Sequence, residues 1–368
     1  MRIGIDATTA AQTRIVGISR FIVNLIANLV EVDPETEYYL FYRPRAFKRP
    51  RCIWRPQNDR FHIRVLQEPF NRRLFRSLDV FHATYQRLPA YYDLVPYIGS
   101  LHDIFYLSQP EMGSPRTRQR WQARYADVAQ RSRLVMTLSE FSKSEIVRLL
   151  GTPPDKVRVV PLAAGPGYVA RDERSVAALR ARYGLEQPYI LYGGGFGRRK
   201  NVVGALRAFA RALPRLPTDV GFAISGTGGP LEGEARAFVQ SAQLGARVKF
   251  LGFVVDEDYP GLMTGSVLYF FPSLLEGFGL PALEAMACGA PVVTSSTTSL
   301  PEVCGTAAVL VDPTNDVPMA DALVEVTRNT ALRVELRRKG IERAREFTWR
   351  RVAETIVGLY REIASTGP

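Results

Sequence analysis

The stretch Glu276-Gly-Phe-Gly-Leu-Pro-Ala-Leu-Glu284 holds two carboxylates with seven residues between them. An apolar strand that ends at Pro272 precedes it, and Pro281 favours a helix that begins near Leu280. Glu276 is then on a loop, and Glu284 lies on the helix. A loop carboxylate can bond sugar hydroxyls, one on the helix can bind the vicinal hydroxyls of a ribose, and the N–H groups of the helix N-terminus can bind a diphosphate. The stretch therefore predicts a site for a ligand that carries hydroxyls and a diphosphate.

Each of the two acids also has an ordinary structural interpretation. Glu284 can be a first-turn acid that favours the helix dipole, and Glu276 can be a solvated loop residue. Two acids at this spacing are common, but Gly277 and Gly279 let the backbone approach a ligand closely. The glycines, the proline and the strand-loop-helix context together favour the binding site.

The elements that position this stretch follow one repeating pattern along the chain. Short apolar runs alternate with amphipathic segments, which is typical of parallel β/α units, and residues 161–188 interrupt them with Pro and Gly and without a clear period. We expect an α/β fold of two Rossmann-like doubly wound domains: residues 1–165, joined by a C-terminal helix at 350–366 after a corner at Trp349, and residues 166–349. Their sheets would face a central cleft, where ligands should bind.

The composition agrees with two packed domains. The 368 residues are too many for one ordinary core, and 46% of them are hydrophobic, as in globular proteins. No apolar run reaches the roughly 18 residues that span a bilayer, and the N-terminus lacks a signal-peptide pattern, so we expect a cytoplasmic protein. Cys52, Cys288 and Cys304 match neither a zinc site nor a disulfide framework and are interpreted as reduced thiols.

The positive charge is concentrated in one segment. Of the net charge of +12, residues 43–76 supply +9, from eleven Arg or Lys and two acids. Such a segment can contact anionic lipid, phosphorylated substrates or nucleic acid, and it can equally be a solvated Arg-rich face.

No metal site or common nucleotide motif is found. The only histidines, His62, His82 and His102, have no second ligand close in sequence. Asp256-Glu-Asp258 spells the D-x-D of metal-dependent transferases, but it directly precedes a helix, where acids serve as caps and dipole partners. The glycine clusters fit neither the ATP-binding nor the NAD-binding pattern. We therefore expect no metal and no cofactor.

The stretch from Glu276 to Glu284 resembles the E-x7-E signature of glycosyltransferase family 4. Further similar stretches support this along nearly the whole chain: Gly17-Ile-Ser-Arg-Phe-Ile, Leu101-His-Asp-Ile, Leu138-Ser-Glu-Phe-Ser, Gly193-Gly-Gly-Phe-Gly-Arg-Arg-Lys-Asn201, Phe250-Leu-Gly-Phe-Val and Ser299-Leu-Pro-Glu-Val. The resemblance implies the two-domain GT-B fold and a retaining, metal-independent transfer of a hexose from a nucleotide-diphosphate sugar.

The resemblance also implies roles for individual residues. Glu276 would contact the donor hexose, the backbone from Phe278 through Gly279 to Leu280 would offer N–H groups, and Glu284 would hold the ribose. Arg199 and Lys200 match the family's basic pair that binds the diphosphate. Many members have a further Arg several residues before the Lys, but here that position falls in Gly193-Gly-Gly195. Arg199 would therefore have to bind more of the diphosphate charge.

Three further residues complete the predicted site. Gly17 would leave room for the donor diphosphate, and His102 resembles the family histidine near the sugar C6 hydroxyl and the acceptor. Gly226 follows an expected strand and would line the nucleotide pocket. The ordinary alternatives are a turn glycine for Gly17, a satisfied strand-end histidine for His102 and a loop glycine cluster for Gly226.

The donor and acceptor stay open. The pattern is similar to mannosyltransferases of bacterial surface polysaccharide synthesis, which favours GDP-mannose over a UDP-sugar. The acceptor would be a glycan or lipid-linked glycan, with residues 43–76 in peripheral contact with an anionic membrane at its inner face. A sugar-nucleotide epimerase and a noncatalytic nucleic-acid-binding protein are the other interpretations, and we expect no nucleic-acid partner.

Overall fold

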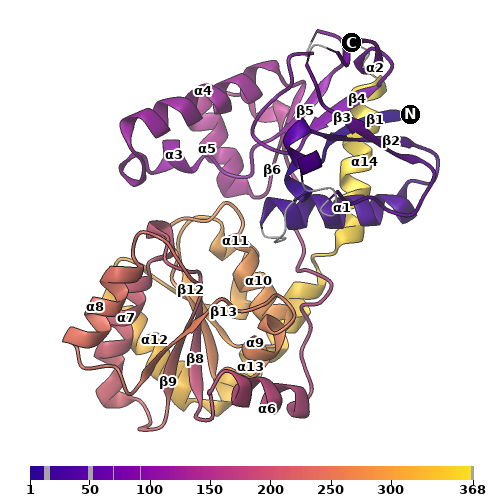
Figure 1. Cartoon of the computed structure of the whole chain (residues 1–368). Coiled ribbons are helices and arrows are strands. Elements are labelled where there is room, and N and C mark those ends of the chain that lie inside the picture. Colours follow the sequence, from indigo (N-terminus) through magenta and orange to yellow (C-terminus); the bar gives the residue numbers. More distant parts are fainter. Residues whose placement is uncertain (12–16, 49–52, 69, 92, 366–368) are drawn as a thin grey trace. The chain divides into compact units, whose positions relative to one another are not determined.

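The computed structural model describes residues 1–11, 17–48, 53–68, 70–91 and 93–365, and these form two compact units (Figure 1). Unit 1 is Met1–Leu162 with the C-terminal stretch from Thr348, and unit 2 is Ala163–Phe347. The sequence placed these divisions after residues 165 and 349. Cys52, Arg49 and Arg51 of the basic segment, and residue 366 of the expected C-terminal helix, lie outside the described residues.

Within its described residues, unit 1 is built on a parallel sheet of seven strands in the order β3-β2-β1-β4-β5-β6-β7. The strands β4, β5 and β6 are buried along their whole length, which is why they read as short apolar runs in the sequence. The strands are β1 (Arg2–Asp6), β2 (Glu37–Tyr42), β3 (Phe61–Val65), β4 (Val80–Ala83), β5 (Tyr97–Ser100), β6 (Leu134–Thr137) and β7 (Val157–Val159).

The last helix of the chain packs on the first helix of unit 1. Apolar residues recur every three or four positions in α14, and they pack with α1 on one face of the sheet. The Tyr360 hydroxyl lies 2.8 Å from Nδ1 of His82, a buried residue of β4, and so ties α14 to the sheet. The helices are α1 (Ile18–Val32), α2 (Arg72–Phe75), α3 (Phe105–Ser108), α4 (Pro115–Arg131), α5 (Glu140–Leu150) and α14 (Trp349–Ser365).

Unit 2 has a parallel sheet of six strands within the described part of the chain, in the order β10-β9-β8-β11-β12-β13. Figure 1 shows α7, α8 and α12 on one face of this sheet and α9, α10 and α13 on the other. The strands are β8 (Tyr189–Gly193), β9 (Gly221–Ser225), β10 (Val248–Gly252), β11 (Leu268–Phe271), β12 (Val292–Ser295) and β13 (Ala308–Val311). The helices are α6 (Glu173–Arg182), α7 (Val202–Ala212), α8 (Glu232–Ser241), α9 (Tyr259–Thr264), α10 (Leu280–Ala287), α11 (Leu300–Cys304), α12 (Asp316–Arg328) and α13 (Thr330–Arg345).

Both sheets reverse their strand order once. In unit 1 the reversal lies between β1 and β4, and in unit 2 between β8 and β11. The region just beyond the carboxyl ends of two such strands is where an open parallel sheet usually binds its ligand. Among the described residues, no helix has both the length and the apolar character needed to cross a membrane.

Candidate functional site

The loops after β8 and β11 lie against each other at the switch point of unit 2. The Leu274 N–H donates to the Arg199 carbonyl at 2.7 Å, and Oγ of Ser273 lies 3.0 Å from the same oxygen. Arg199 and Lys200 belong to a short 3-10 turn after β8, and Glu276 lies on the loop after β11. The sheet order therefore brings together two predicted site segments that are far apart in the sequence.

Glu276 is at the centre of this contact. Its Oε1 accepts from the Lys200 ammonium at 2.6 Å, the Arg199 guanidinium at 2.7 Å and the Ser273 hydroxyl at 2.7 Å. The side chain of Glu276 is only 8% exposed and that of Lys200 12%. Lys200 is further fixed over the ring of Phe271, at 4.7 Å from its centre. Two cations and one carboxylate leave this cluster with a net charge of +1.

The cations determine the ionisation of Glu276. Burial by itself would raise the pKa of the Glu276 carboxyl, but the charges of Lys200 and Arg199 and the hydrogen bonds from Lys200 and Ser273 together lower it to about 2. Glu276 is therefore a carboxylate at any physiological pH, and it holds both cations in fixed positions.

Hydroxyl and amide side chains hold the loop backbone around Glu276. The Ser299 hydroxyl donates to the Glu276 carbonyl at 2.9 Å, and the Glu276 N–H donates to the Thr298 hydroxyl at 3.3 Å. Asn201, at a φ of 62°, bridges the carbonyls of Pro272 and Pro313 with its amide group at 3.1 and 2.7 Å. Sequence reasoning missed the roles of Ser273 and Thr298, although small hydroxyl residues just beyond a strand are a signal for such support.

The helix α10 begins as predicted, at Leu280 with Pro281 in its first turn. Gly279 precedes it at a φ of 105°, and a Cβ atom there would lie 2.7 Å from Leu300, so both the backbone and the space require glycine. The Phe278 ring is buried edge-on against Phe347. Within the described part of the chain, the backbone N–H groups of Phe278, Gly279 and Leu280 donate no hydrogen bond. They form the donor-rich helix N-terminus that the sequence predicted.

Glu284 lies on α10 beyond its first turn and is buried, so it is not the first-turn acid of the ordinary interpretation. Its charge adds to burial in raising the pKa values of Tyr259 and Tyr269. The Tyr269 hydroxyl donates to the carbonyl of Gly193, the last residue of β8, at 2.9 Å. Glu284 therefore lies within electrostatic reach of Tyr259 and of Tyr269, whose hydroxyl bonds the last residue of β8.

A glycine pair brings a third loop to the same edge. Gly226 follows β9 at a φ of 119°, and a Cβ atom on it would lie 2.8 Å from the Cα of Gly195. Its N–H donates to the Gly252 carbonyl at 2.8 Å. The loops after β8, β9 and β11 therefore converge. Of the site residues predicted in unit 2, Arg199 and Lys200 directly contact Glu276.

Gly17 and His102 lie at the corresponding edge of unit 1. Gly17 precedes α1 with φ 49° and ψ −115°, a conformation that favours glycine, and no atom of the described residues lies within 4 Å of the position a Cβ would take. His102 follows β5 and is buried, with Nε2 at 2.9 Å from the Thr84 carbonyl. A carbonyl can only accept, so Nε2 carries the proton and Nδ1 is an acceptor. Burial lowers the pKa of His102, which keeps the ring neutral.

The other two histidines, which could act as metal ligands, have protein partners. His62 contacts Glu37, and His82 contacts Ser100 and Tyr360. In the parts of the chain described here, no three His, Cys, Asp or Glu residues gather in a way that could hold a metal ion. Asp258 directly precedes α9 as expected, but its side chain makes no capping hydrogen bond to that helix. It pairs instead with Arg182 at 3.0 Å and accepts from the Tyr183 hydroxyl at 2.8 Å.

Comparison with known proteins agrees with this arrangement. Residues 15–164 match the model described as Glycosyltransferase Family 4, and residues 177–347 match that described as Glycosyl transferases group 1. O-antigen chain mannosyltransferase B of Escherichia coli is 33% identical over 267 residues, which cover 72% of this chain and 70% of that protein. Serotype-specific mannosyltransferase WbdA of the same organism is 27% identical, but the match covers only 32% of its length.

Among solved structures, sucrose-phosphate synthase from Thermosynechococcus elongatus superimposes with a TM-score of 0.76 at 20% identity and full coverage of both chains. This likeness shows the fold, which is GT-B as expected. The chain therefore belongs to glycosyltransferase family 4, whose members are retaining hexosyltransferases that need no metal ion.

Proposed function

We propose that this enzyme transfers mannose from GDP-mannose, with retention of the α configuration, to a glycan or lipid-linked glycan during surface polysaccharide synthesis. The similarity to O-antigen chain mannosyltransferase B supports the sugar and the pathway class. A UDP-sugar is the second candidate donor. Family membership favours a transferase over the epimerase and the nucleic-acid-binding protein that the sequence also left open.

The cluster of Glu276, Arg199 and Lys200 supports a role in leaving-group departure. When the bond between the sugar C1 and the phosphate oxygen breaks, negative charge develops on the diphosphate. Cations that are already fixed by Glu276 stabilise that charge without reorganising. The N–H groups of Phe278, Gly279 and Leu280 would bind the same diphosphate, and Glu284 would bind the ribose. Gly226 would line the nucleotide pocket, and Gly17 would leave room for the diphosphate.

Glu276 and His102 would orient the sugar. The three donors on Glu276 all bind Oε1, so Oε2 is the oxygen we assign to the sugar hydroxyls. His102 would accept a hydroxyl hydrogen at Nδ1, because its Nε2 proton is engaged by Thr84. The acceptor oxygen then forms a bond to C1 on the face that the diphosphate leaves, and its proton passes to the departing phosphate oxygen.

Thermal unfolding with nucleoside diphosphates tests the donor. GDP at a hundred times its dissociation constant should add about 2.7 kcal/mol to the free energy of unfolding, and UDP at the same concentration should add less. The product made from GDP-mannose should be α-linked by NMR. Stabilisation by UDP alone would replace GDP-mannose with a UDP-sugar, and a β-linked product would refute retention.

The basic segment supports peripheral contact of unit 1 with an anionic membrane. Beside the exposed Arg72, Arg73 and Arg76 of this segment, the Phe70 ring is 77% exposed. An aromatic ring beside cations suits the interface between lipid head groups and acyl chains. We therefore place the enzyme, as a proposal, at the inner face of the cell membrane, where a lipid-linked acceptor would be found.

Vesicle sedimentation tests this contact. The double variant Arg73→Glu/Arg76→Glu should bind vesicles of anionic lipid at least about twentyfold more weakly than the wild type, since each basic residue near the surface contributes about 1 kcal/mol. The matched control Arg116→Glu/Arg174→Glu makes the same charge change in the first turns of α4 and α6, where an acid is tolerated. Equal loss in both variants, or no binding by the wild type, would contradict the proposed surface.

A further inference from the structure

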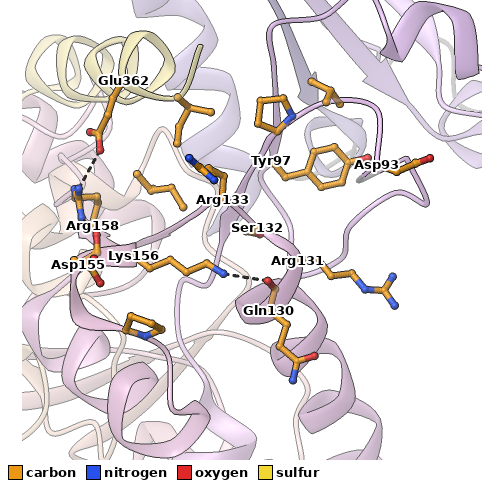
Figure 2. A pocket seen from close by; sticks show the side chains of 15 residues that line it. Asp93, Tyr97, Gln130, Arg131, Ser132, Arg133, Asp155, Lys156, Arg158 and Glu362 are labelled. Atoms are coloured by element: carbon orange, nitrogen blue, oxygen red, sulfur yellow. Dashed lines mark hydrogen bonds and ion pairs between the residues drawn. The ribbon is translucent and has the colours of Figure 1, made fainter. Parts of the chain in front are cut away.

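A depression of about 690 Å³ lies at the amino edge of the sheet in unit 1 (Figure 2). Its lining comes from the segments just before β5, β6 and β7 and from the end of α14. His102 follows the carboxyl end of β5, so the depression is at the opposite edge of the sheet from the residues assigned to sugar transfer. The function proposed above uses none of its side chains.

Four cations line the depression, and two of them are neutralised. Arg131 pairs with Asp127 at 3.0 Å. Arg158 pairs with Glu362 of α14 at 3.0 Å. These two pairs account for the charges of Arg131 and Arg158.

The other two cations, Arg133 and Lys156, form no ion pair with any carboxylate in the described residues. Lys156 donates to the Gln130 carbonyl, at the C-terminal end of α4, at 3.1 Å. The two acids left on the rim do not reach them: Asp93 is 3.6 Å from Arg72, and the exposed Asp155 forms no ion pair in the described part of the chain. Figure 2 shows Arg133 and Lys156 among the lining side chains.

The two cations repel each other. Burial lowers the pKa of the Lys156 ammonium, and the charge of Arg133 lowers it further. An anion bound between them would remove this repulsion and supply the missing counter-charge. A guanidinium fork and an ammonium are the pair of donors that recognise a phosphate group well.

We propose that this depression binds a phosphorylated sugar through Arg133 and Lys156. Its volume falls in the range of small-molecule pockets, about 300–1,000 Å³, and so exceeds what a phosphate ion needs. The carboxylates of Asp155 and Glu362 on the same rim can accept hydrogen bonds from sugar hydroxyls. This site is separate from the donor site and does not depend on the identity of the donor or acceptor.

Calorimetric titration with glucose 6-phosphate tests the proposal in a protein that carries Lys200→Ala, which weakens phosphate binding at the donor site. Binding should persist in this background. Arg133→Ala and Lys156→Met should each weaken it about tenfold or more, as expected for the loss of one charge-assisted hydrogen bond. Lys156→Met keeps the apolar stem of the side chain, and Arg133 is exposed, so both variants should fold.

The control is Arg148→Ala, which removes one exposed cation of α5 outside the depression. It should leave the affinity for glucose 6-phosphate unchanged. Inorganic phosphate should bind more weakly than glucose 6-phosphate, since it lacks the hydroxyls. Equal affinity of the two ligands would refute the sugar, and affinity that is insensitive to both Arg133→Ala and Lys156→Met, or absent at millimolar concentrations, would refute the site.

Discussion

Replacing Lys200 by alanine is expected to lower kcat/KM for sugar transfer by about 100- to 1,000-fold, the usual effect of removing one fixed group that stabilises developing negative charge. Lys200 is held from two sides, by Glu276 at 2.6 Å and by the ring of Phe271. A cation fixed in this way stabilises the departing diphosphate more than the bound donor. The loss should therefore appear mainly in kcat, measured as initial rates over a range of GDP-mannose concentrations.

The matched control is Arg198→Ala. Arg198 belongs to the same 3-10 turn and carries the same charge, but its side chain is exposed. This variant should retain nearly wild-type kinetics. A Lys200→Ala enzyme with unchanged kcat and a raised KM would show that Lys200 binds the donor without stabilising the transition state. Wild-type values of both constants would remove Lys200 from the site.

Lys200→Arg should not restore the rate. The position is only 12% exposed, and a planar guanidinium needs more room than an ammonium on a flexible stem. We expect this variant to bind GDP, because the charge is kept, and to transfer sugar more slowly than the wild type, because the charge is displaced. Binding and catalysis measured on the same variant separate the presence of the charge from its position.

The sequence predicted most of the fold because the parallel strands are buried on both faces. Runs such as the one at β11 are apolar throughout, and turn residues mark their ends. The helix α6 was missed for the opposite reason. It has no buried residue, so no apolar stripe distinguishes Glu173–Arg182 from a polar loop. The helix α12 was also not predicted; its Pro318 lies in the first turn, where proline is tolerated.

The ion pair of Asp258 is a second contact that the sequence did not reveal. Position alone suggested a cap for the helix that follows it. Its partners Arg182 and Tyr183 lie 76 and 75 residues away, at the end of a helix that the sequence did not reveal. A local pattern could not predict this contact, because it depends on how two helices pack.

The candidate site shows the same limit. The loop position of Glu276 and the start of α10 follow from local signals that the chain itself carries. The contact of Glu276 with Arg199 and Lys200 depends on β8 and β11 being neighbours in the sheet, although two other strands separate them in the sequence. The resemblance assigned the two cations to the diphosphate, and the geometry adds that one carboxylate holds both.

Of the substitutions proposed here, Glu276→Gln is expected to lower the free energy of unfolding the most. The size of this loss should depend on pH. The carboxyl pKa of about 2 in the folded protein is below its ordinary value of 4.5. A lowered folded-state pKa gives stability that is fully present above the unfolded value and is lost as the pH falls through the folded value. A folded-state pKa of about 2 against the ordinary 4.5 corresponds to about 3 kcal/mol of stability.

Urea unfolding of the wild type and Glu276→Gln measures this contribution. Near neutral pH the variant should be less stable by about 3 kcal/mol, because Lys200 and Arg199 lose their counter-charge at a buried position. The gap should shrink as the pH falls from 4.5 towards 2, where the wild-type carboxyl itself becomes neutral. The exposed Glu186 gives the control Glu186→Gln, which should follow the wild type at every pH.

The pH dependence separates two explanations for a loss of activity in Glu276→Gln. If Glu276 only bonds the sugar, the variant should lose transfer with little change in stability, because an amide can keep the hydrogen bonds of the loop. If Glu276 also fixes the cations, transfer and stability should fall together, and the stability gap should close in acid. A gap that stays constant down to pH values near 2 would contradict the ion pairs, whereas a closing gap would mean that the residue assigned to the sugar also positions the charges assigned to the diphosphate.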